Sequence, residues 1–329
     1  MGGVRTPISD PLRVGPYRIV GRLGSGGMGW VYLGRSASGR ALALKVVRPE
    51  LASDQQFRDR FAREVEAARA VSGAFTAAVV DADTQGDPPW LATLYVAGPS
   101  LAEAVRGDGP LSESATRRLG AGLAEALQAI HAAGVVHRDL KPANVLLAED
   151  GPRVIDFGIS LFGGSSSITL AGTVLGTPPF MSPEQFRGEL AGPPSDVFSL
   201  GSVLAFAVTG KSPFGSGSGV MYRVLHEQPA LDSVPDGLRP LVGRCLAKDP
   251  WDRPTPAGLL DELLRGRSVP VWPPPTVAET IQVRKDDLAA RNHSRGSVTS
   301  VPSCLLLHAQ ALLDAGLTDR MVAEAVARG

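Results

Sequence analysis

Three polar side chains that could act together lie in the segment VHRDLKPANV, residues 136–145. Asp139 can orient a hydroxyl group and accept its proton, and Lys141 can neutralise charge on a phosphoryl group during transfer. Asn144 can ligate Mg²⁺ through its side-chain oxygen. A second metal-ligating carboxylate follows at Asp156, in the tripeptide DFG. This order of residues is typical of a phosphoryl-transfer site and argues against unrelated charges on solvated loops.

Glycines recur upstream, where Gly24, Gly26 and Gly29 form the pattern G-x-G-x-x-G. Glycines let backbone amides approach phosphate groups without a side-chain clash. The pattern alone is weak, because an ordinary glycine-rich hairpin also produces it. Strand-like segments flank it on both sides. It is therefore better interpreted as a hairpin that covers phosphates than as the strand-to-helix turn of a dinucleotide-binding fold.

Two charged residues occupy positions where the pattern predicts apolar ones. Lys45 ends the run ALALK, and the alternation of a strand places it on the same face as Ala41 and Ala43. Glu64 lies seven residues after Phe57, on the apolar side of a predicted helix. A buried charge requires a partner, so we expect these two residues to pair rather than to be unrelated charges at the edges of their elements.

The elements that must position these residues occur as strands first and helices later. Strands are predicted within residues 17–47. A helix follows, with Ser53 and Gln56 as a capping box, and a second amphipathic helix is predicted over residues 112–134. The segment DVFSLGSVLAFAVTG is apolar nearly all round, which indicates a helix buried inside a larger helical lobe.

On these motifs the sequence resembles the eukaryotic-like (Hanks-type) serine/threonine protein kinases, and is most similar to their bacterial members. The resemblance covers residues 17–265. It implies an α+β fold of two lobes, with a mostly β N-lobe over about 17–97 and a helical C-lobe over about 98–265. It also implies transfer of the γ-phosphoryl group of ATP, with Mg²⁺ or alternatively Mn²⁺, to serine or threonine hydroxyls of protein substrates.

The resemblance implies a nucleotide site between the two lobes. Lys45 would hold the α- and β-phosphates, oriented by Glu64. Thr93 would be the gatekeeper, small enough to leave a back pocket open, with the hinge at residues 94–96. Adenine would lie among Val31, Ala43 and Leu146. The full expected set is Leu23, Gly24, Ser25, Gly26, Gly27, Met28, Gly29, Val31, Ala43, Lys45, Glu64, Thr93, Leu94, Val96, Leu146 and Asp156.

Other residues are implied to support the site structurally. Asp196, on the buried helix, would hold the backbone of residues 136–145, the catalytic loop. Glu184 would pair with Arg253 as a buried bridge, in a Ser182-Pro183-Glu184 segment where the family often has alanine in place of serine.

Regulation is expected in the segment between Asp156 and Glu184, which is rich in serine, threonine and glycine. We expect autophosphorylation on Thr169 or Thr173, because the guanidinium of Arg138 can bind a phosphothreonine with two hydrogen bonds. Thr177 would instead hydrogen-bond Asp139 and Lys141, and Lys141 is itself the mark of serine/threonine specificity.

Two alternative functions share much of this machinery. A pseudokinase would keep the fold as a nucleotide-binding scaffold, but such proteins normally lose one of the catalytic side chains that are all retained here. A small-molecule phosphotransferase on the same fold is disfavoured by GTPPFMSPE, which resembles a docking surface for an extended peptide.

The composition of the chain narrows the binding partners and the cellular compartment that we expect. The 33 Lys and Arg residues balance 33 Asp and Glu residues, so no overall field attracts nucleic acid or an anionic membrane. Two distant cysteines indicate neither a disulfide framework nor a zinc site, which suits a cytoplasmic location. No secretory leader or membrane span is predicted. Relatives dimerise through the N-lobe, and a homodimer of this kind is an expectation.

Both ends of the chain lie outside the expected kinase domain. Residues 1–16 form an N-terminal extension. Residues 266–280 are proline-rich and predicted to be a stiff linker. Residues 281–329 are predicted to be a tail that is partly disordered and able to form one or two short helices.

Overall fold

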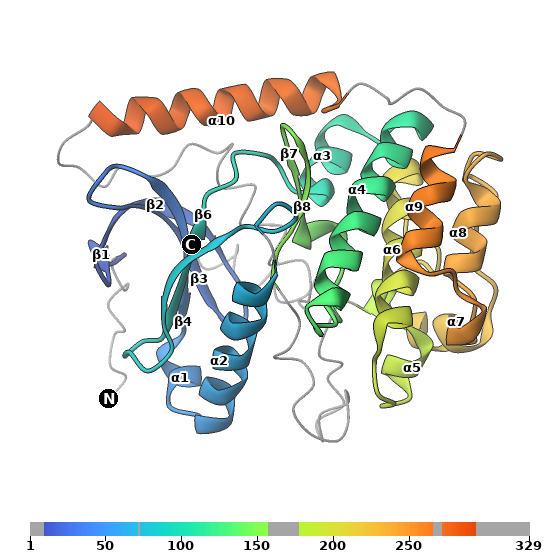
Figure 1. Ribbon diagram of the computed structural model, residues 1–329, viewed down its shortest axis with the longest axis horizontal. Helices are drawn as coiled ribbons and strands as arrows, with labels where there is room; N and C mark the ends of the chain where they lie inside the picture. The colour runs from blue at the N-terminus through green and yellow to red at the C-terminus, as the bar shows by residue number, and fades with distance from the viewer. Residues whose placement is uncertain (1–9, 72, 157–177, 266–271, 294–329) are drawn as a thin grey trace, which may run out of the picture.

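The computed structural model describes residues 10–71, 73–156, 178–265 and 272–293. These residues form two lobes, with an antiparallel sheet and two helices on one side and a larger group of helices on the other (Figure 1). The α+β, two-lobed fold predicted from the sequence is therefore confirmed.

The N-lobe is built on a six-stranded sheet in the order β1-β2-β3-β4-β6-β5, with every neighbouring pair antiparallel. Its elements are β1 (Arg13–Val14), β2 (Tyr17–Ser25), β3 (Gly29–Arg35), β4 (Ala41–Val47), α1 (Pro49–Ala52), α2 (Gln55–Ala70), β5 (Val79–Asp83) and β6 (Trp90–Leu94).

The pleat of β4 explains how an apolar strand presents a lysine. Leu42 and Leu44 are fully buried on one face, in a cluster with Tyr17 of β2. Successive side chains of a strand point to opposite faces. Ala43 and Lys45 therefore lie on the other face of β4, where both line a cleft between the lobes.

Helix α2 begins one residue later than the predicted capping box requires. Asp54 is the N-cap, and its Oδ1 accepts hydrogen bonds from the backbone N–H groups of Gln56 and Phe57 at 2.8 and 3.4 Å. The predicted Ser53 cap is therefore wrong, since an aspartate one position on takes the same role. The buried face still includes Phe57 and Glu64, as the periodicity predicts.

The C-lobe is mostly helical and packs around α6. Its elements are α3 (Leu101–Asp108), α4 (Glu113–Ala132), η1 (Pro142–Asn144), β7 (Val145–Ala148), β8 (Gly151–Val154), η3 (Pro178–Phe180), α5 (Pro183–Phe186), α6 (Pro193–Thr209), α7 (Val220–His226), α8 (Arg239–Cys245), η4 (Pro250–Asp252) and α9 (Pro256–Leu264). Helix α6 is buried over most of its circumference and ends at Gly210, which has a left-handed φ of 72°.

Ordered elements extend beyond the expected kinase domain at both ends. Val14 of the N-terminal extension is buried, and β1 pairs with β2. Helix α10 (Pro275–His293) begins inside the predicted linker, residues 266–280, and continues into the predicted tail, residues 281–329. The physical reason is that Val277 and Ile281 bury their side chains in the C-lobe core. Residues 294–329 of the predicted tail lie outside the described residues.

None of the helices in the described ranges combines the length and the apolar composition that a membrane crossing requires.

Candidate active site

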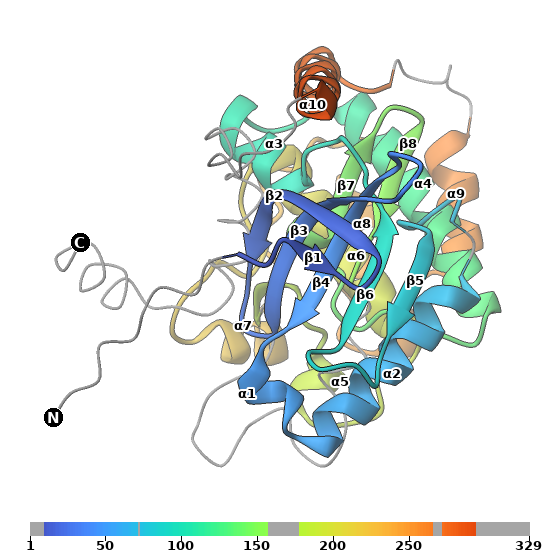
Figure 2. The ribbon, with the colours of Figure 1, turned by 90° about the vertical axis from the view of Figure 1, so that its left-hand side faces the viewer.

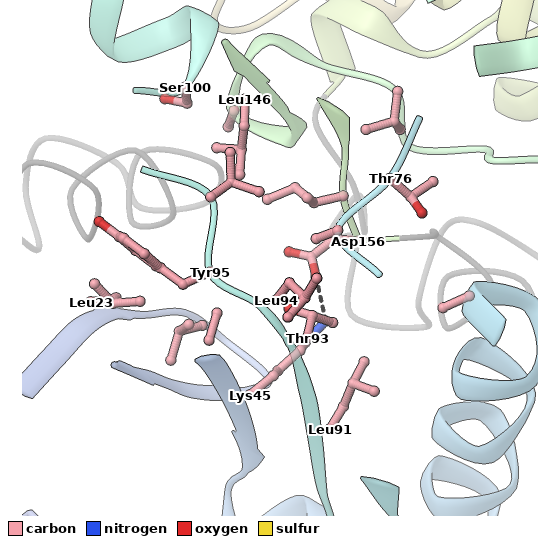
Figure 3. A pocket seen from close by; sticks show the side chains of 18 of the residues that line it. Leu23, Lys45, Thr76, Leu91, Thr93, Leu94, Tyr95, Ser100, Leu146 and Asp156 are labelled. Atoms are coloured by element: carbon pink, nitrogen blue, oxygen red, sulfur yellow. Dashed lines mark hydrogen bonds and ion pairs between the residues drawn. The ribbon is translucent and has the colours of Figure 1, made fainter. Parts of the chain in front are cut away.

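A cleft between the two lobes encloses about 980 Å³, including space open to solvent. The close view in Figure 3 shows Leu23 from the sheet and Leu146 from β7 on its walls, with Lys45 and Asp156 joined across it. Its lining residues are Leu23, Val31, Ala43, Lys45, Glu64, Ala68, Thr76, Ala77, Leu91, Thr93, Leu94, Tyr95, Val96, Ser100, Ala143, Leu146, Val154, Ile155 and Asp156.

Three charged side chains from three separate elements meet at one end of this cleft. The Nζ of Lys45 on β4 lies 3.1 Å from Oδ1 of Asp156, which follows β8 (Figure 3). The same Nζ lies 2.9 Å from Oε1 of Glu64 on α2. Glu64 is only 3% exposed. The expected pairing of Lys45 with Glu64 is present, and the same ammonium group also contacts the aspartate of the DFG motif.

The ionisation of these three side chains follows from their burial and from the charges of their neighbours. Burial alone would lower the pKa of Lys45, but the neighbouring Asp156 and Glu64 carboxylates outweigh it and raise that pKa. Burial likewise favours the neutral form of Asp156, yet Lys45 and Lys141 hold its pKa below the usual range. For Glu64, burial dominates and raises the pKa. Both directions favour the charged forms, an ammonium at Lys45 beside a carboxylate at Asp156.

A second cluster joins the three polar residues of the catalytic loop. The Nζ of Lys141 lies 2.9 Å from Oδ2 of Asp139. The Nδ2 amide of Asn144, a residue that is almost completely buried, donates to the Asp139 carbonyl at 2.9 Å and to its Oδ2 at 3.1 Å. The carboxylate of Asp139 is thus oriented by a cation and an amide.

Asn144 and Asp156 offer oxygen ligands of the kind that Mg²⁺ prefers. Because both side-chain hydrogen bonds of Asn144 use Nδ2, its carbonyl oxygen Oδ1 points away from Asp139. The N–H of Ile155 donates to the Asn144 backbone carbonyl at 2.9 Å, which holds the two candidate ligands on adjacent backbones. No cluster of three His, Cys, Asp or Glu residues that could hold a metal occurs in the described ranges. Two protein oxygen donors suit a cation that takes its other ligands from phosphate and water.

Asp196 of α6 hydrogen-bonds the backbone of the catalytic loop and holds it in place. Its carboxylate accepts the backbone N–H groups of His137 at 2.9 Å and Arg138 at 2.8 Å, where Arg138 has a strained φ of 65°. His131, at the end of α4, lies 2.8 Å from the same carboxylate. The His137 ring accepts from the N–H of Asp139 and lies 3.1 Å from the Ile155 carbonyl, so it connects the loop to the strand before Asp156.

The expected pair of Glu184 and Arg253 is present as a buried bidentate bridge. The two nitrogen–oxygen distances are 2.7 and 2.9 Å, and Ser195 Oγ adds a third hydrogen bond to Glu184 at 2.6 Å. Burial opposes ionisation of Glu184, but the hydrogen bonds from Arg253 and Ser195 outweigh it and lower the pKa of this carboxyl.

Comparison with known proteins decides the family. The family described as "Protein kinase domain" matches residues 17–264, about three quarters of the chain. The chain belongs to the protein kinase family. Its relatives include proteins that are named serine/threonine-protein kinases.

The probable serine/threonine-protein kinase PkwA of Thermomonospora curvata is 54% identical over 83% of this chain and 37% of its own length. The serine/threonine-protein kinase AfsK of Streptomyces coelicolor is 57% identical over 77% of this chain and 32% of its own length. This kinase thus spans about a third of the curated relatives it matches. The PknI kinase domain of Mycobacterium tuberculosis is similar in structure, with a TM-score of 0.62 at 26% identity, covering 78% of this chain and 98% of that one.

Most of the predicted nucleotide-binding residues of the kinase meet in the cleft. Those that line it are Leu23, Val31, Ala43, Lys45, Glu64, Thr93, Leu94, Val96, Leu146 and Asp156. Asp139, Lys141 and Asn144 lie beside the cleft without lining it. The predicted residues Thr169, Thr173 and Thr177 lie outside the described residues.

The tip of the glycine-rich hairpin, residues 24–29, does not line the cleft. Gly26 and Gly29 exchange backbone hydrogen bonds at 2.9 and 3.3 Å, and β3 follows directly, so the dinucleotide-binding alternative is wrong. Gly29 has a structural reason to be glycine, because a Cβ there would lie 1.9 Å from the Val46 carbonyl oxygen. Arg48, which the sequence did not single out, donates from Nε to the Gly26 carbonyl at 3.1 Å.

Sequence reasoning missed several residues of the cleft wall. The cleft continues along β6 from Thr93 to Leu91 and reaches Ala68 of α2, which agrees with the open back pocket expected behind a small gatekeeper. Thr76 joins this wall through an isolated bridge with Val154. No local pattern predicts that contact, whereas Leu91 could have been found from the two-residue period of its strand.

Proposed function

We propose that this kinase transfers the γ-phosphoryl group of ATP to serine and threonine hydroxyls of protein substrates, with Mg²⁺ as the metal and Mn²⁺ as its alternative. The observation that carries the proposal is the Lys45 ammonium, which contacts Glu64 and Asp156 at once. The family requires this lysine–glutamate pair for transfer.

The walls of the cleft suit a nucleotide. Val31, Ala43 and Leu146 supply apolar surface for adenine from opposite lobes. Among the described residues, nothing hydrogen-bonds the backbone groups of Val96, so these groups are available to the adenine edge. The ammonium group of Lys45, whose pKa is raised, lies at one end of the cleft and suits the α- and β-phosphates.

The catalytic loop supplies the groups that act at the reacting atoms. Asp139 would orient the substrate hydroxyl and accept its proton, because Lys141 and Asn144 keep its carboxylate in place. Lys141 would neutralise charge on the transferred phosphoryl group. Asn144 and Asp156 would hold Mg²⁺, which when bound neutralises phosphate charge.

We propose further that the kinase phosphorylates itself on Thr169 or Thr173, in the activation loop, which is the segment between Asp156 and Glu184. The Nε of Arg138 is buried and has no hydrogen-bond partner among the described residues, so this guanidinium is suited to bind a phosphate. Mass spectrometry of protein made with ATP should find a phosphate on one of these threonines in the wild type and none in Asp139→Asn. An unmodified wild-type loop would overturn this part of the proposal.

A cytoplasmic location is part of the proposal, because ATP is available to the domain there. The free, buried thiol of Cys245 is compatible with a reducing compartment. A homodimer through the N-lobe stays a prediction.

The test against the pseudokinase alternative measures transfer itself. Wild-type protein is incubated with [γ-³²P]ATP, Mg²⁺ and a generic basic protein, beside Asp139→Asn as the matched variant. We expect label on phosphoserine or phosphothreonine from the wild type and none from the variant, with nucleotide binding in both. Binding without any transfer by the wild type would establish the scaffold function instead.

A further inference from the structure

Helix α10 lies outside the segment that matches the kinase family, yet it packs against both lobes. Figure 1 shows it along one edge of the molecule, from above α3 to above β2, and Figure 2 shows the same helix end-on at that edge. Its inward face carries Val277, Ile281 and Arg284, which are 1, 4 and 4% exposed. The spacing of four and three residues places all three on one side of the helix.

The buried charge on this face points at the connection between the lobes. Arg284 Nη1 donates to the Gly98 carbonyl at 2.8 Å, and its Nη2 lies 3.5 Å from Oε1 of Glu103. Gly98 comes two residues after Val96, the last hinge residue that lines the cleft. A cation on α10 therefore holds the backbone immediately beyond the hinge.

That backbone is tightly confined, so a hydrogen bond to it has structural consequences. A Cβ on Gly98 would lie 2.0 Å from the Leu147 carbonyl oxygen, and the Leu147 N–H donates to the Pro99 carbonyl at 2.8 Å. Ser100, which lines the cleft, donates its N–H to Glu103 Oε2 at 2.6 Å. Arg284 thus contacts two groups whose positions determine one wall of the nucleotide site.

The same helix is also attached to the N-lobe. Arg35, at the end of β3, is almost completely buried and donates from Nη2 to the Leu288 carbonyl at 2.5 Å. Before the other end of α10, the indole N–H of Trp272 donates to the Ala148 carbonyl of β7 at 2.9 Å. The segment 272–293 is therefore hydrogen-bonded to both lobes.

We propose that α10 is a strap across the hinge, and that Arg284 is a positioning residue for the nucleotide site. The proposal rests on the proposed function, because it assumes that ATP binds in the cleft. A site held in its binding geometry before the ligand arrives loses less conformational freedom on binding. Removing Arg284 frees the backbone beyond the hinge and weakens nucleotide affinity without removing any group that contacts the phosphates.

The experiment compares Arg284→Ala, Arg284→Lys and Lys285→Ala in the full chain. Lys285 is the matched control, since it is the next residue, is exposed, and pairs with Glu149 on the surface. The probe is a fluorescent ADP analogue, and steady-state kinetics supply KM for ATP and kcat. We expect a Kd about three- to tenfold weaker for Arg284→Ala, as for the loss of one charge-assisted hydrogen bond. Arg284→Lys should recover part of that loss, and Lys285→Ala should bind as the wild type does.

Separate measurements of KM and kcat distinguish a positioning role of Arg284 from a general loss of structure. Arg284→Ala should raise KM for ATP in parallel with Kd and leave kcat within about twofold of the wild type. An unchanged Kd in Arg284→Ala would overturn the proposal that α10 is a strap across the hinge. A wild type that binds no nucleotide at all would instead overturn the proposed function, so the two failures are distinguishable.

The unmodified protein supplies a test that does not depend on the folding of a variant. Coupling between two sites is reciprocal, so nucleotide that binds more tightly because of α10 must in turn stabilise α10. Hydrogen exchange of peptides covering residues 281–291 should slow when the ADP analogue is added. Exchange in this helix that does not respond to saturating nucleotide would also overturn the proposal.

Discussion

Arg253 and Glu184, which lie 69 positions apart in the sequence, form a bidentate ion pair inside the C-lobe, where the Arg253 side chain is 0% exposed. The guanidinium also donates to the backbone carbonyls of Ala247 and Pro194, both at 2.9 Å. The pair thereby connects α5, which contains Glu184, to the start of α6 and to the turn before α9. A buried pair with this many hydrogen bonds tolerates the loss of neither partner.

Arg253→Ala should destabilise the domain by about 3–5 kcal/mol, because it leaves the Glu184 carboxylate buried without its cation. Urea unfolding followed by circular dichroism measures the change. Arg69→Ala is the control, since Arg69 pairs with Glu66 in an exposed i,i+3 bridge; its cost should stay below about 1 kcal/mol. Equal costs for the two variants would contradict the buried bridge.

The pair of Glu184 and Arg253 also predicts that the stability of the domain depends on pH. Because the folded-state pKa of Glu184 lies below its usual value of 4.5, the unfolded state binds the proton first as the pH falls. The contribution of Glu184 to stability is therefore fully present above that value and is lost as the pH falls through the lower, folded-state pKa. The difference in unfolding free energy between wild type and Glu184→Gln should be constant near neutral pH and should shrink in acid. A difference that grows in acid would show the opposite sign of the shift.

Asp196 should affect turnover more than nucleotide affinity. Asp196→Asn replaces a carboxylate oxygen that accepts backbone N–H groups with an amide nitrogen that cannot accept. The catalytic loop then loses one of its anchors, and kcat should fall by roughly ten- to a hundredfold, since small displacements of reacting groups cost that much. The Kd of the ADP analogue should not change. A normal kcat in this variant would mean that the loop is held by other contacts.

The sequence predicted the elements and their buried faces well, since these depend on local periodicity. Lys45 and Glu64 stood out because each interrupts an apolar pattern, and a buried charge demands a partner. The position of the cap at Asp54 was one residue off, because Ser, Thr, Asp and Asn all serve at an N-cap. Such local signals are short-range and leave small errors at element ends.

Contacts between distant segments could not be predicted in this way. Thr76 lies in an irregular segment, where it forms a bridge with Val154, and it lines the cleft. Arg284 interrupts the apolar face of α10, so the periodicity of that helix was hidden and its proline-rich start resembled a linker. Both residues depend on tertiary packing, for which a single sequence contains no local pattern.

Gly98 should tolerate no side chain. In Gly98→Ala the new Cβ would lie 2.0 Å from the Leu147 carbonyl oxygen, so the backbone beyond the hinge must shift. We expect weaker binding of the ADP analogue and a loss of stability of about 1–3 kcal/mol, as for other overpacked sites. Gly107→Ala in α3 is the control, because open space surrounds that position; it should stabilise by about 0.5–1 kcal/mol. Unchanged binding and stability in Gly98→Ala would contradict the close approach.

Transfer of ³²P from [γ-³²P]ATP by Lys45→Met tests the central claim most directly. This substitution removes the cation that contacts both Glu64 and Asp156 and leaves a side chain of similar length. Lys211→Met, at an exposed position in the C-lobe, is the matched control. We predict that Lys45→Met loses at least about a thousandfold in rate, equivalent to roughly 4 kcal/mol of transition-state stabilisation, while Lys211→Met keeps wild-type activity. Transfer by Lys45→Met at the wild-type rate would contradict the account.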